Sequence, residues 1–446
     1  MDNRTIAAIS TPQGVGGIAV IRISGENSIA IADSIFKGKT KLSDAPTHTV
    51  HYGKIINNGE EIDEVLVTVM RAPKTFTRED VVEISTHGGY VASRRVLNTL
   101  FEKGAYPAMA GEFTKRAFMN GRIDLSQAEA VIDIINAKTD LAQKNALTQA
   151  DGHLAKRIEE IRSTLTNLAA AMQVSIDYPD EDLEELTAEE ISEQLGKVYS
   201  ELSRLADTAP RGRVLKNGIK TAIIGRPNVG KSSLLNYLAM EERAIVTDIA
   251  GTTRDVIEEL VDLDGVPLRL LDTAGIRSTE DTVEKIGVER SLKYIDEAEL
   301  ILLVLDAKSG LTEEDRELLS KTQGKNRIVL VNKTDECEGF FVEDAIMISA
   351  KTGAGISEMS AKIKELYSLE KITAEEITLT NERQLAALLR AKEAVLRAVD
   401  VLGGGMEQDF AALDINEALA AIGEIDGRTV TEDIVSEVFH NFCVGK

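Results

Sequence analysis

Residues 225–232 read Gly-Arg-Pro-Asn-Val-Gly-Lys-Ser, and this stretch decides the fold of the middle of the chain. It matches the P-loop pattern, because the apolar run Thr221–Ile224 precedes it and a predicted helix over Ser233–Leu238 follows it. Backbone N–H groups of such a loop can cradle phosphates, while Lys231 reaches the β- and γ-oxygens and the Ser232 hydroxyl can bind Mg²⁺. So short a pattern also arises by chance in glycine-rich turns. The motifs further along the chain therefore have to distinguish a nucleotide-binding loop from such a turn.

Five short apolar runs predict a buried sheet around this loop. Their hydrophobicity is continuous rather than alternating, which indicates burial on both faces and a largely parallel sheet between helices. The predicted strands are Thr221–Ile224, Leu268–Leu271, Leu300–Leu305, Ile328–Val331 and Ala345–Ile348. The expected fold of this part is an α/β, Ras-like P-loop domain.

Two motifs after the last two strands predict guanine specificity. Residues 332–335 read Asn-Lys-Thr-Asp, and the Asp335 carboxylate can accept hydrogen bonds from the N1–H and N2–H₂ groups of guanine. Adenine has no such pair of donors, so Asp335 is expected to select GTP over ATP. Ser349, Ala350 and Lys351 follow the next strand and are expected to contact the guanine O6.

Two further motifs predict the groups around the γ-phosphate. Asp272-Thr273-Ala274-Gly275 follows a strand, which places Asp272 to hold the Mg²⁺ shell through water and the Gly275 N–H to sense the γ-phosphate. Residues 248–253 read Asp-Ile-Ala-Gly-Thr-Thr, and we favour Thr253 over Thr252 as the second Mg²⁺ ligand besides Ser232. The candidate GTP-binding residues are Asn228, Val229, Gly230, Lys231, Ser232, Ser233, Thr247, Asp248, Ile249, Ala250, Gly251, Thr252, Thr253, Asp272, Thr273, Ala274, Gly275, Asn332, Lys333, Asp335, Ser349, Ala350 and Lys351.

Ile276 stands where Ras-like switches carry the glutamine that orients the attacking water. An apolar side chain cannot do this, and the nearest carboxylates in sequence are Glu280, Asp281 and Glu284. Solvated charges on a switch segment explain these residues equally well on the sequence alone. The candidate catalytic residues are Lys231, Thr253 and Glu284.

The sequence on either side of the nucleotide domain shows two other secondary-structure patterns. Residues 1–118 are expected to be α+β, with strand-like runs at 17–23 and 64–69. Residues 119–216 and 371–446 are expected to be helical, on either side of the nucleotide domain at 217–370. We therefore predict a multidomain α+β and α/β protein in which the Ras-like domain is inserted into one helical domain. Two apolar stripes are expected to be bundle core: Leu154, Ile158, Ile161, Leu165, Leu168 and Met172, and Leu385, Leu388, Val395, Val399 and Leu402.

Composition limits the class of protein. The 446 residues carry a net charge of −23, which argues against a protein that coats nucleic acid non-specifically. No apolar run approaches the roughly 20 residues of a membrane span. The two cysteines, Cys337 and Cys443, imply no disulfide framework, and the first ten residues lack a signal peptide pattern, so a cytoplasmic location is expected. The acidic run at residues 177–182 is expected to be a solvated loop.

The chain resembles the MnmE (TrmE) family over its whole length. The resemblance is carried by the P-loop, by the residues 247–254 (Thr-Asp-Ile-Ala-Gly-Thr-Thr-Arg), by the Cys-Val-Gly-Lys tail at 443–446, by residues 11–25 and by His87-Gly88-Gly89. It implies a GTPase that works with a flavoprotein partner, MnmG (GidA), which would carry the FAD. Together they would add a carboxymethylaminomethyl or aminomethyl group to C5 of the wobble uridine, position 34, of certain tRNAs. A 5-formyl- or 5,10-methylene-tetrahydrofolate would supply the one-carbon unit.

The resemblance also assigns residues. It implies K⁺ at Asn228, Thr247, Ile249 and Thr252, with K⁺ in place of an arginine finger and Glu284 positioning water. It implies nucleotide domains that dimerise on K⁺ and GTP, a homodimer through the N-terminal domain, and a heterotetramer with the partner. The implied folate-binding residues are Arg22, Glu83, Arg122 and Lys446. Some relatives have lysine at the position of Arg122, which keeps the charge but changes the donor geometry.

Two readings of other classes stay open. A regulatory switch GTPase of ribosome assembly would carry the same P-loop domain, although no KH-type GXXG flanked by basic residues occurs. An inactive scaffold GTPase is disfavoured because Lys231, Ser232, Thr253 and Asp272 are all present.

Overall fold

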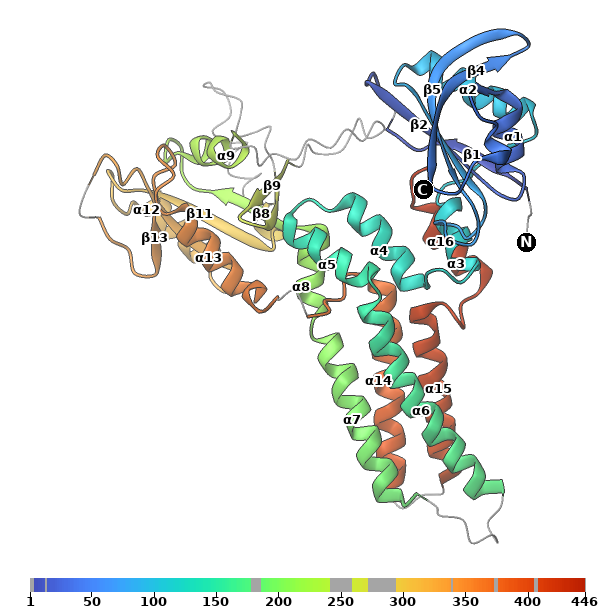
Figure 1. Ribbon diagram of the computed structural model, residues 1–446. Helices are drawn as coiled ribbons and strands as arrows, with labels where there is room; N and C mark the ends of the chain where they lie inside the picture. Colours follow the sequence, from blue (N-terminus) through green and yellow to red (C-terminus); the bar gives the residue numbers. More distant parts are fainter. Residues whose placement is uncertain are drawn as a thin grey trace. The chain divides into compact units, whose positions relative to one another are not determined.

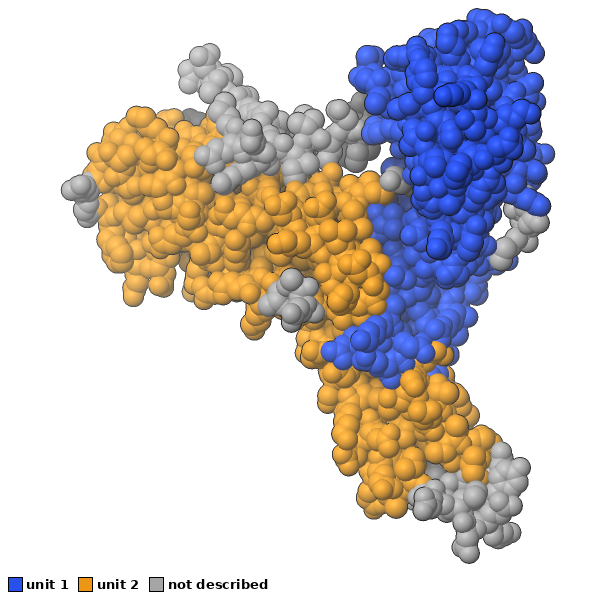
Figure 2. Space-filling model, in the orientation of Figure 1, with its two compact units in different colours: residues 1–132, 155–160, 419–446 blue, residues 133–154, 161–418 orange. Residues whose placement is uncertain are grey.

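The computed structural model is drawn as a ribbon in Figure 1, and its chain forms two compact units, which Figure 2 shows in different colours. One unit comprises residues 1–132, 155–160 and 419–446, and the other comprises residues 133–154 and 161–418. The structure describes residues 4–12, 14–177, 186–240, 259–271, 294–337, 340–372, 376–404 and 408–445. Of the predicted acidic loop, only Asp177, the last residue of a helix, lies within these ranges.

The first unit is built on a seven-stranded sheet with the order β3-β4-β5-β6-β2-β1-β7. Its strands are β1 (Ile6–Ile9), β2 (Ile18–Ser24), β3 (Phe36–Gly38), β4 (Thr49–Asn57), β5 (Glu60–Met70), β6 (Val81–His87) and β7 (Tyr106–Pro107). All neighbouring strands are antiparallel except β1 and β7. The two strand-like runs predicted in this region fall on β2 and β5, so the α+β class is confirmed.

Alternating side chains give this sheet one face that is fully covered and one face that is only partly covered. Ile21 and Ile23 on β2 are buried against helices α1 (Ser28–Ile35) and α2 (Tyr90–Glu102), in a core that includes alternate residues of β5 and β6. Because successive side chains of a strand point to opposite faces, Arg22 lies on the other face. We call that face the open face of the sheet.

The C-terminal segment belongs to the same unit. Helix α16 (Glu432–His440) packs with α3 (Glu112–Met119) and with the start of α4 (Leu125–Asn136) around buried aromatic side chains. Beyond α16 the chain runs alongside the sheet, where Val444 bridges Ala110 and the Ser10 Oγ donates to the Gly445 carbonyl at 3.0 Å. Gly445 has φ +95°, and a Cβ there would lie 2.5 Å from the Ile9 carbonyl oxygen, so this close approach requires glycine.

The second unit contains the helical part of the chain. Its helices are α5 (Asp140–Ala150), most of α6 (His153–Asp177), α7 (Ala188–Ala206), α8 (Ala209–Asn217), α14 (Glu382–Gly403) and most of α15 (Gln408–Asp426). Helix α14 packs against α7, so helical segments from before and after the nucleotide domain lie together, as predicted. No helix in the described ranges is long and apolar enough to cross a membrane.

The stripe predicted on α6 is fully buried, whereas the stripe predicted on α14 is buried only in part. All six stripe residues of α6 are at most 6% exposed, which confirms that prediction. On α14, Leu388, Val395 and Leu402 are buried but Leu385 and Val399 are only partly so. Gln384 and four alanines, Ala387, Ala391, Ala394 and Ala398, occupy the rest of the buried face. The small side chains give α14 a broader contact face than the leucine spacing predicts.

The nucleotide domain is a six-stranded sheet with the order β13-β12-β11-β8-β10-β9. The strands are β8 (Ile219–Ile224), β9 (Glu259–Leu263), β10 (Val266–Leu270), β11 (Leu300–Asp306), β12 (Arg327–Asn332) and β13 (Ala345–Met347). All pairs are parallel except β9 with β10, and apolar clusters cover both faces, which confirms the prediction. The accompanying helices are α9 (Lys231–Met240), α12 (Glu313–Lys321) and α13 (Ile356–Leu366).

Candidate functional site

The P-loop joins the end of β8 to the start of α9, and its two glycines stand where other residues would clash. At Gly225, φ is +152° and a Cβ would lie 2.4 Å from the Val304 carbonyl oxygen on β11. At Gly230, φ is +100° and a Cβ would lie 2.1 Å from the Asn332 Nδ2 at the end of β12. The loop is therefore pressed against the ends of β11 and β12, which fixes where its backbone N–H groups point.

Lys231 begins α9 and folds back over the loop. Its Nζ donates to the carbonyl oxygens of Gly225 at 2.7 Å and Arg226 at 2.8 Å. Burial lowers the pKa of this ammonium group below its ordinary value. A half-buried cation at a helix N-terminus attracts phosphate strongly, because little water competes for it.

Asn332 ties three of the predicted motifs together. It is 2% exposed; its Nδ2 donates to the Val229 carbonyl at 2.9 Å, and its Oδ1 accepts the Ala350 N–H at 2.9 Å. The side chain thus links the P-loop to the residues 349–351. In this structure Asn332 positions the other motifs.

Lys333 makes a second link to the P-loop. Its Nζ donates to the Asn228 carbonyl at 2.7 Å and to the Asp306 Oδ2 at 2.7 Å. Burial acts to raise the pKa of Asp306, but the bonds from Lys333 and the Lys308 N–H, with the Arg226 charge, outweigh it and lower the pKa. Sequence reasoning missed Asp306, although a carboxylate that ends a buried strand at the carboxyl edge of a parallel sheet was a usable signal.

Asp335 and Ser349 lie next to each other at the carboxyl ends of β12 and β13. The Ser349 Oγ donates to the Asp335 Oδ1 at 2.7 Å, and Ser349 is 1% exposed. This bond orients the carboxylate that was predicted to read the guanine edge. The residues after β8, β12 and β13 therefore meet at one edge of the sheet.

Arg226 connects the loop to α12, which the sequence did not suggest. Its Nε donates to the Asp315 Oδ2 at 3.2 Å, and its guanidinium also contacts Ser309. Asp315 is fully buried and forms a capping box with Thr312 at the start of α12. The P-loop is thus held from the strand side and from the helix side.

Several predicted residues lie outside the described part of the chain, and the structure does not test them. They are Thr247, Asp248, Ile249, Ala250, Gly251, Thr252, Thr253, Asp272, Thr273, Ala274, Gly275, Ile276, Glu280, Asp281, Glu284 and Lys446. The described Mg²⁺ candidate, Ser232, lies in the first turn of α9 and is exposed.

A second group of polar residues lies on the open face of the N-terminal sheet. Arg22 on β2 is the direct cross-strand neighbour of Glu83 on β6. The Arg22 Nε and Nη2 both contact the Glu83 Oε1 at 2.8 Å, and the two side chains are 20% and 27% exposed. The Arg22 guanidinium also lies 5.7 Å from the centre of the Phe113 ring and donates to the Gly445 carbonyl at 3.3 Å. The pair is half-buried and accessible from one side.

Arg122 reaches the same apolar cluster from another direction. Its guanidinium lies 5.1 Å from the centre of the Phe76 ring. Phe76 packs against Ile6, Ala8, Ala108 and Phe113, which we call the Phe76–Phe113 cluster. Arg22 and Arg122, predicted from the resemblance, therefore border one cluster, and Arg22 also pairs with Glu83 and contacts the C-terminal tail at Gly445. Sequence reasoning missed Phe76 and Phe113, since neither stands near the others in the chain.

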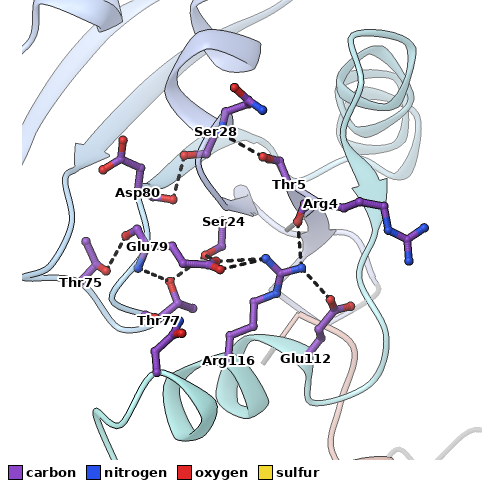
Figure 3. A network of polar contacts seen from close by, with 12 residues as sticks. Arg4, Thr5, Ser24, Ser28, Thr75, Thr77, Glu79, Asp80, Glu112 and Arg116 are labelled. Atoms are coloured by element: carbon purple, nitrogen blue, oxygen red, sulfur yellow. Dashed lines mark hydrogen bonds and ion pairs between the residues drawn. The ribbon is translucent and has the colours of Figure 1, made fainter. Parts of the chain in front are cut away.

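A partly buried polar network holds α3 and its Phe113 against the sheet (Figure 3). The Arg116 Nη1 donates to both carboxylate oxygens of Glu79 at 3.1 Å, and its Nη2 donates to the Arg4 carbonyl and to Glu112, each at 2.9 Å. The Ser24 Oγ donates to Glu79 at 2.7 Å at the end of β2. This network fixes the ring of Phe113 beside Arg22, so its role is to position the site.

The sheet order, the P-loop and the Asn-Lys-Thr-Asp motif at residues 332–335 define the class of protein: the chain is a P-loop GTPase, an enzyme that hydrolyses GTP. Family models described as "GTP-binding protein TrmE N-terminus" and "MnmE helical domain" match residues 5–122 and 125–443. The chain belongs to the MnmE family of tRNA modification GTPases.

Three relatives named tRNA modification GTPase MnmE align over nearly the full length. That of Acetivibrio thermocellus is 47% identical over 99% of this chain and 99% of its own. Those of Geobacillus thermodenitrificans and Enterococcus faecalis are 50% and 48% identical, over 99% and 100% of this chain and 99% of each relative. Among solved structures, the G domain of the T. maritima FeoB iron transporter is 28% identical over 34% of this chain and 98% of its own, with a TM-score of 0.26.

Proposed function

We propose that this GTPase is stimulated by K⁺ and uses a reduced folate to modify tRNA. With the flavoprotein MnmG, which carries FAD, it adds a carboxymethylaminomethyl or aminomethyl group to C5 of the wobble uridine in the cytoplasm. The single observation that carries the folate part is the half-buried Arg22–Glu83 pair beside Phe113 on the open face.

The residues present suit a folate. A pterin is flat and presents adjacent N–H donors, which match a carboxylate such as Glu83 and can stack beside Arg22 or an aromatic ring. The glutamate carboxylates of a folate suit an arginine, and Arg122 borders the same cluster as Phe113. When bound, the folate supplies the one-carbon unit; the protein residues bind and orient it.

On the nucleotide side, each proposed role follows from charge and position. Lys231 neutralises the β- and γ-oxygens, and Asp335 with Ser349 reads guanine. Ser232 and Thr253 hold Mg²⁺, while Asn228, Thr247, Ile249 and Thr252 hold K⁺ in place of an arginine finger. Asn228 is exposed on the P-loop with φ +65°, where its backbone is fixed by Lys333 and its amide is accessible. Glu284 aligns the attacking water.

We also propose that the chain forms a homodimer through the open face. Val50, Tyr52, Leu66 and Ile18 on this face are 60%, 63%, 47% and 66% exposed, and the pairing of β4 with β5 places Tyr52 opposite Leu66, with Val50 two residues away on β4. Neighbouring apolar side chains exposed on a sheet are typical of an interface. The dimer would pair with MnmG as a heterotetramer. Leu66→Asp should give a monomer in light scattering. An unchanged dimer would show that the interface does not lie on the open face.

A reconstituted reaction tests the proposal. The full chain, purified MnmG, an unmodified tRNA transcript and GTP are combined with a folate labelled with ¹³C in its one-carbon unit, in K⁺ or in Na⁺ at equal ionic strength. Mass spectrometry of the nucleosides should show the label on the wobble uridine, with GTP turnover several-fold faster in K⁺. GTP turnover with no label on any nucleoside would instead favour the regulatory switch of ribosome assembly.

A further inference from the structure

A cavity of about 450 Å³ opens in the first unit next to Arg122. His48, Lys74, Arg78 and Arg122 bring basic groups to its lining, with Phe76 and Met70 among its apolar walls. Among the described residues, its lining includes no carboxylate, although the chain as a whole has a net charge of −23. A basic cavity on so acidic a protein points to an anionic occupant.

The cations of this cavity are not neutralised by neighbours. The Arg78 Nη1 donates to the Asn120 carbonyl at 2.9 Å, which is a neutral partner, and Arg122 lies over the Phe76 ring. Within the described ranges, neither Lys74, Arg78 nor Arg122 pairs with a carboxylate. All three are exposed, so their charge is available to a ligand.

The sheet register places the cavity beside the Arg22–Glu83 pair. Thr68 on β5 pairs with Glu83, and two residues further along Met70, which lines the cavity, pairs with Val81. Since residues two apart in a strand share a face, Met70 lies on the open face, about 7 Å along the strand from the rung of Glu83. Phe76 provides a second link, because it lines the cavity and belongs to the Phe76–Phe113 cluster.

We propose that this cavity binds the γ-linked glutamyl tail of the folate, so that the protein selects polyglutamylated over monoglutamyl folates. The inference rests on the proposed folate site. Each added γ-glutamyl residue contributes one α-carboxylate on a flexible chain, and Lys74 and Arg78, which line the cavity together with Arg122, can receive such groups. A concave cavity that adjoins a ligand face suits a short tethered tail better than the phosphates of a duplex, which call for a broad basic surface.

Isothermal titration of the full-length chain with 5-formyl-tetrahydrofolate carrying one, three or five glutamates tests this proposal. The triglutamate should bind about tenfold or more tightly than the monoglutamate, on the scale of one or two charge-assisted hydrogen bonds, and added salt should reduce that gain. Lys74→Gln with Arg78→Gln should remove most of the gain and leave monoglutamate binding within about twofold of the parent. Arg78→Lys, which keeps the charge, should retain the gain.

Lys39→Gln is the matched control, because Lys39 is exposed just beyond β3 at the far edge of the sheet and should change nothing. Equal affinity for all tail lengths with normal monoglutamate binding would overturn the tail site and leave the proposed function intact. Binding of no folate at all would overturn both. If Lys74→Gln with Arg78→Gln keeps the gain but weakens binding of a tRNA transcript, the cavity serves RNA phosphates and the inference is wrong.

Discussion

The nucleotide edge and the open face of the N-terminal sheet are built on opposite plans. At the nucleotide edge, the contributing groups lie at or just beyond the ends of strands, and short bonds such as that of Asn332 to Val229 join them. On the open face, Arg22 meets the Gly445 carbonyl across 423 positions of sequence, and Phe113 comes from a third segment. Phosphate is held by consecutive backbone N–H groups, whereas a flat heterocycle needs side chains that converge from separate elements.

The largest effect is expected at Glu284. Because Ile276 cannot polarise water, Glu284→Ala should lower GTP turnover in K⁺ by about 10²-fold or more, on the scale of a lost acid–base group. Nucleotide affinity should stay within a few-fold, and folate affinity should not change if the two regions are independent. Stopped-flow turnover and titration measure these quantities. Glu280→Ala and Asp281→Ala are the controls. If Glu284→Ala hydrolyses GTP at near the parental rate, another group aligns the attacking water.

Asp335→Asn tests whether the nucleotide edge recognises the guanine base through this carboxylate. The amide can no longer accept both guanine donors, so GTP affinity should fall at least about tenfold, while xanthosine triphosphate, whose C2 oxygen reverses one hydrogen bond, should bind better. Competition titration with the two nucleotides measures the switch. Unchanged preference for GTP would remove Asp335 from the site.

Gly230→Ala tests whether the contact with Asn332 fixes the P-loop. The new methyl would lie 2.1 Å from the Asn332 Nδ2, at φ +100°, so the loop or the side chain must move. We expect GTP affinity to fall about tenfold, within the range for backbone strain at a functional site, with folate affinity unaffected. Gly196→Ala on α7 is the control, since its methyl would meet no described atom within 4 Å. Parental GTP affinity of Gly230→Ala would show that the loop adapts.

The smallest effect is expected at Asp124, whose side chain caps the N-terminus of α4. The Asp124 carboxylate accepts the Gln127 N–H at 2.8 Å and the Ser126 hydroxyl at 2.7 Å, and burial raises its pKa. Asp124→Ala should cost about 1 kcal/mol of unfolding free energy, as for other lost N-caps. Asp124→Asn keeps the cap and should raise the melting temperature slightly at neutral pH.

The pH dependence of that difference has a definite sign. A carboxyl whose pKa is raised by folding destabilises the native state while it is ionised, and the penalty disappears as it becomes protonated. The advantage of Asp124→Asn should therefore shrink as pH falls through the raised pKa toward the ordinary value of 3.8. An advantage that grows on acidification would mean that burial does not dominate at this site. Thermal melts at a series of pH values measure it.

The same contrast explains how far the sequence could predict the structure. The parallel strands around the P-loop were predictable, since doubly covered strands are continuous apolar runs. Strand β9 was missed because it is an antiparallel edge strand that reads Glu-Leu-Val-Asp-Leu. The order of the N-terminal sheet could not be read from local patterns, because it depends on pairings such as β2 with β6. The Arg22–Glu83 pair came from the resemblance alone, and neither Phe113 nor the basic cavity had a local signature.

The most direct test of a second ligand site, separate from the nucleotide edge, is titration of monoglutamyl 5-formyl-tetrahydrofolate into the full-length chain. The parent should bind one folate per chain. Glu83→Gln should weaken binding about tenfold or more, because a charged acceptor for the pterin donors is lost, while Asp335→Asn should bind folate like the parent. No folate binding to the parent, or equal binding to Glu83→Gln, would contradict the account.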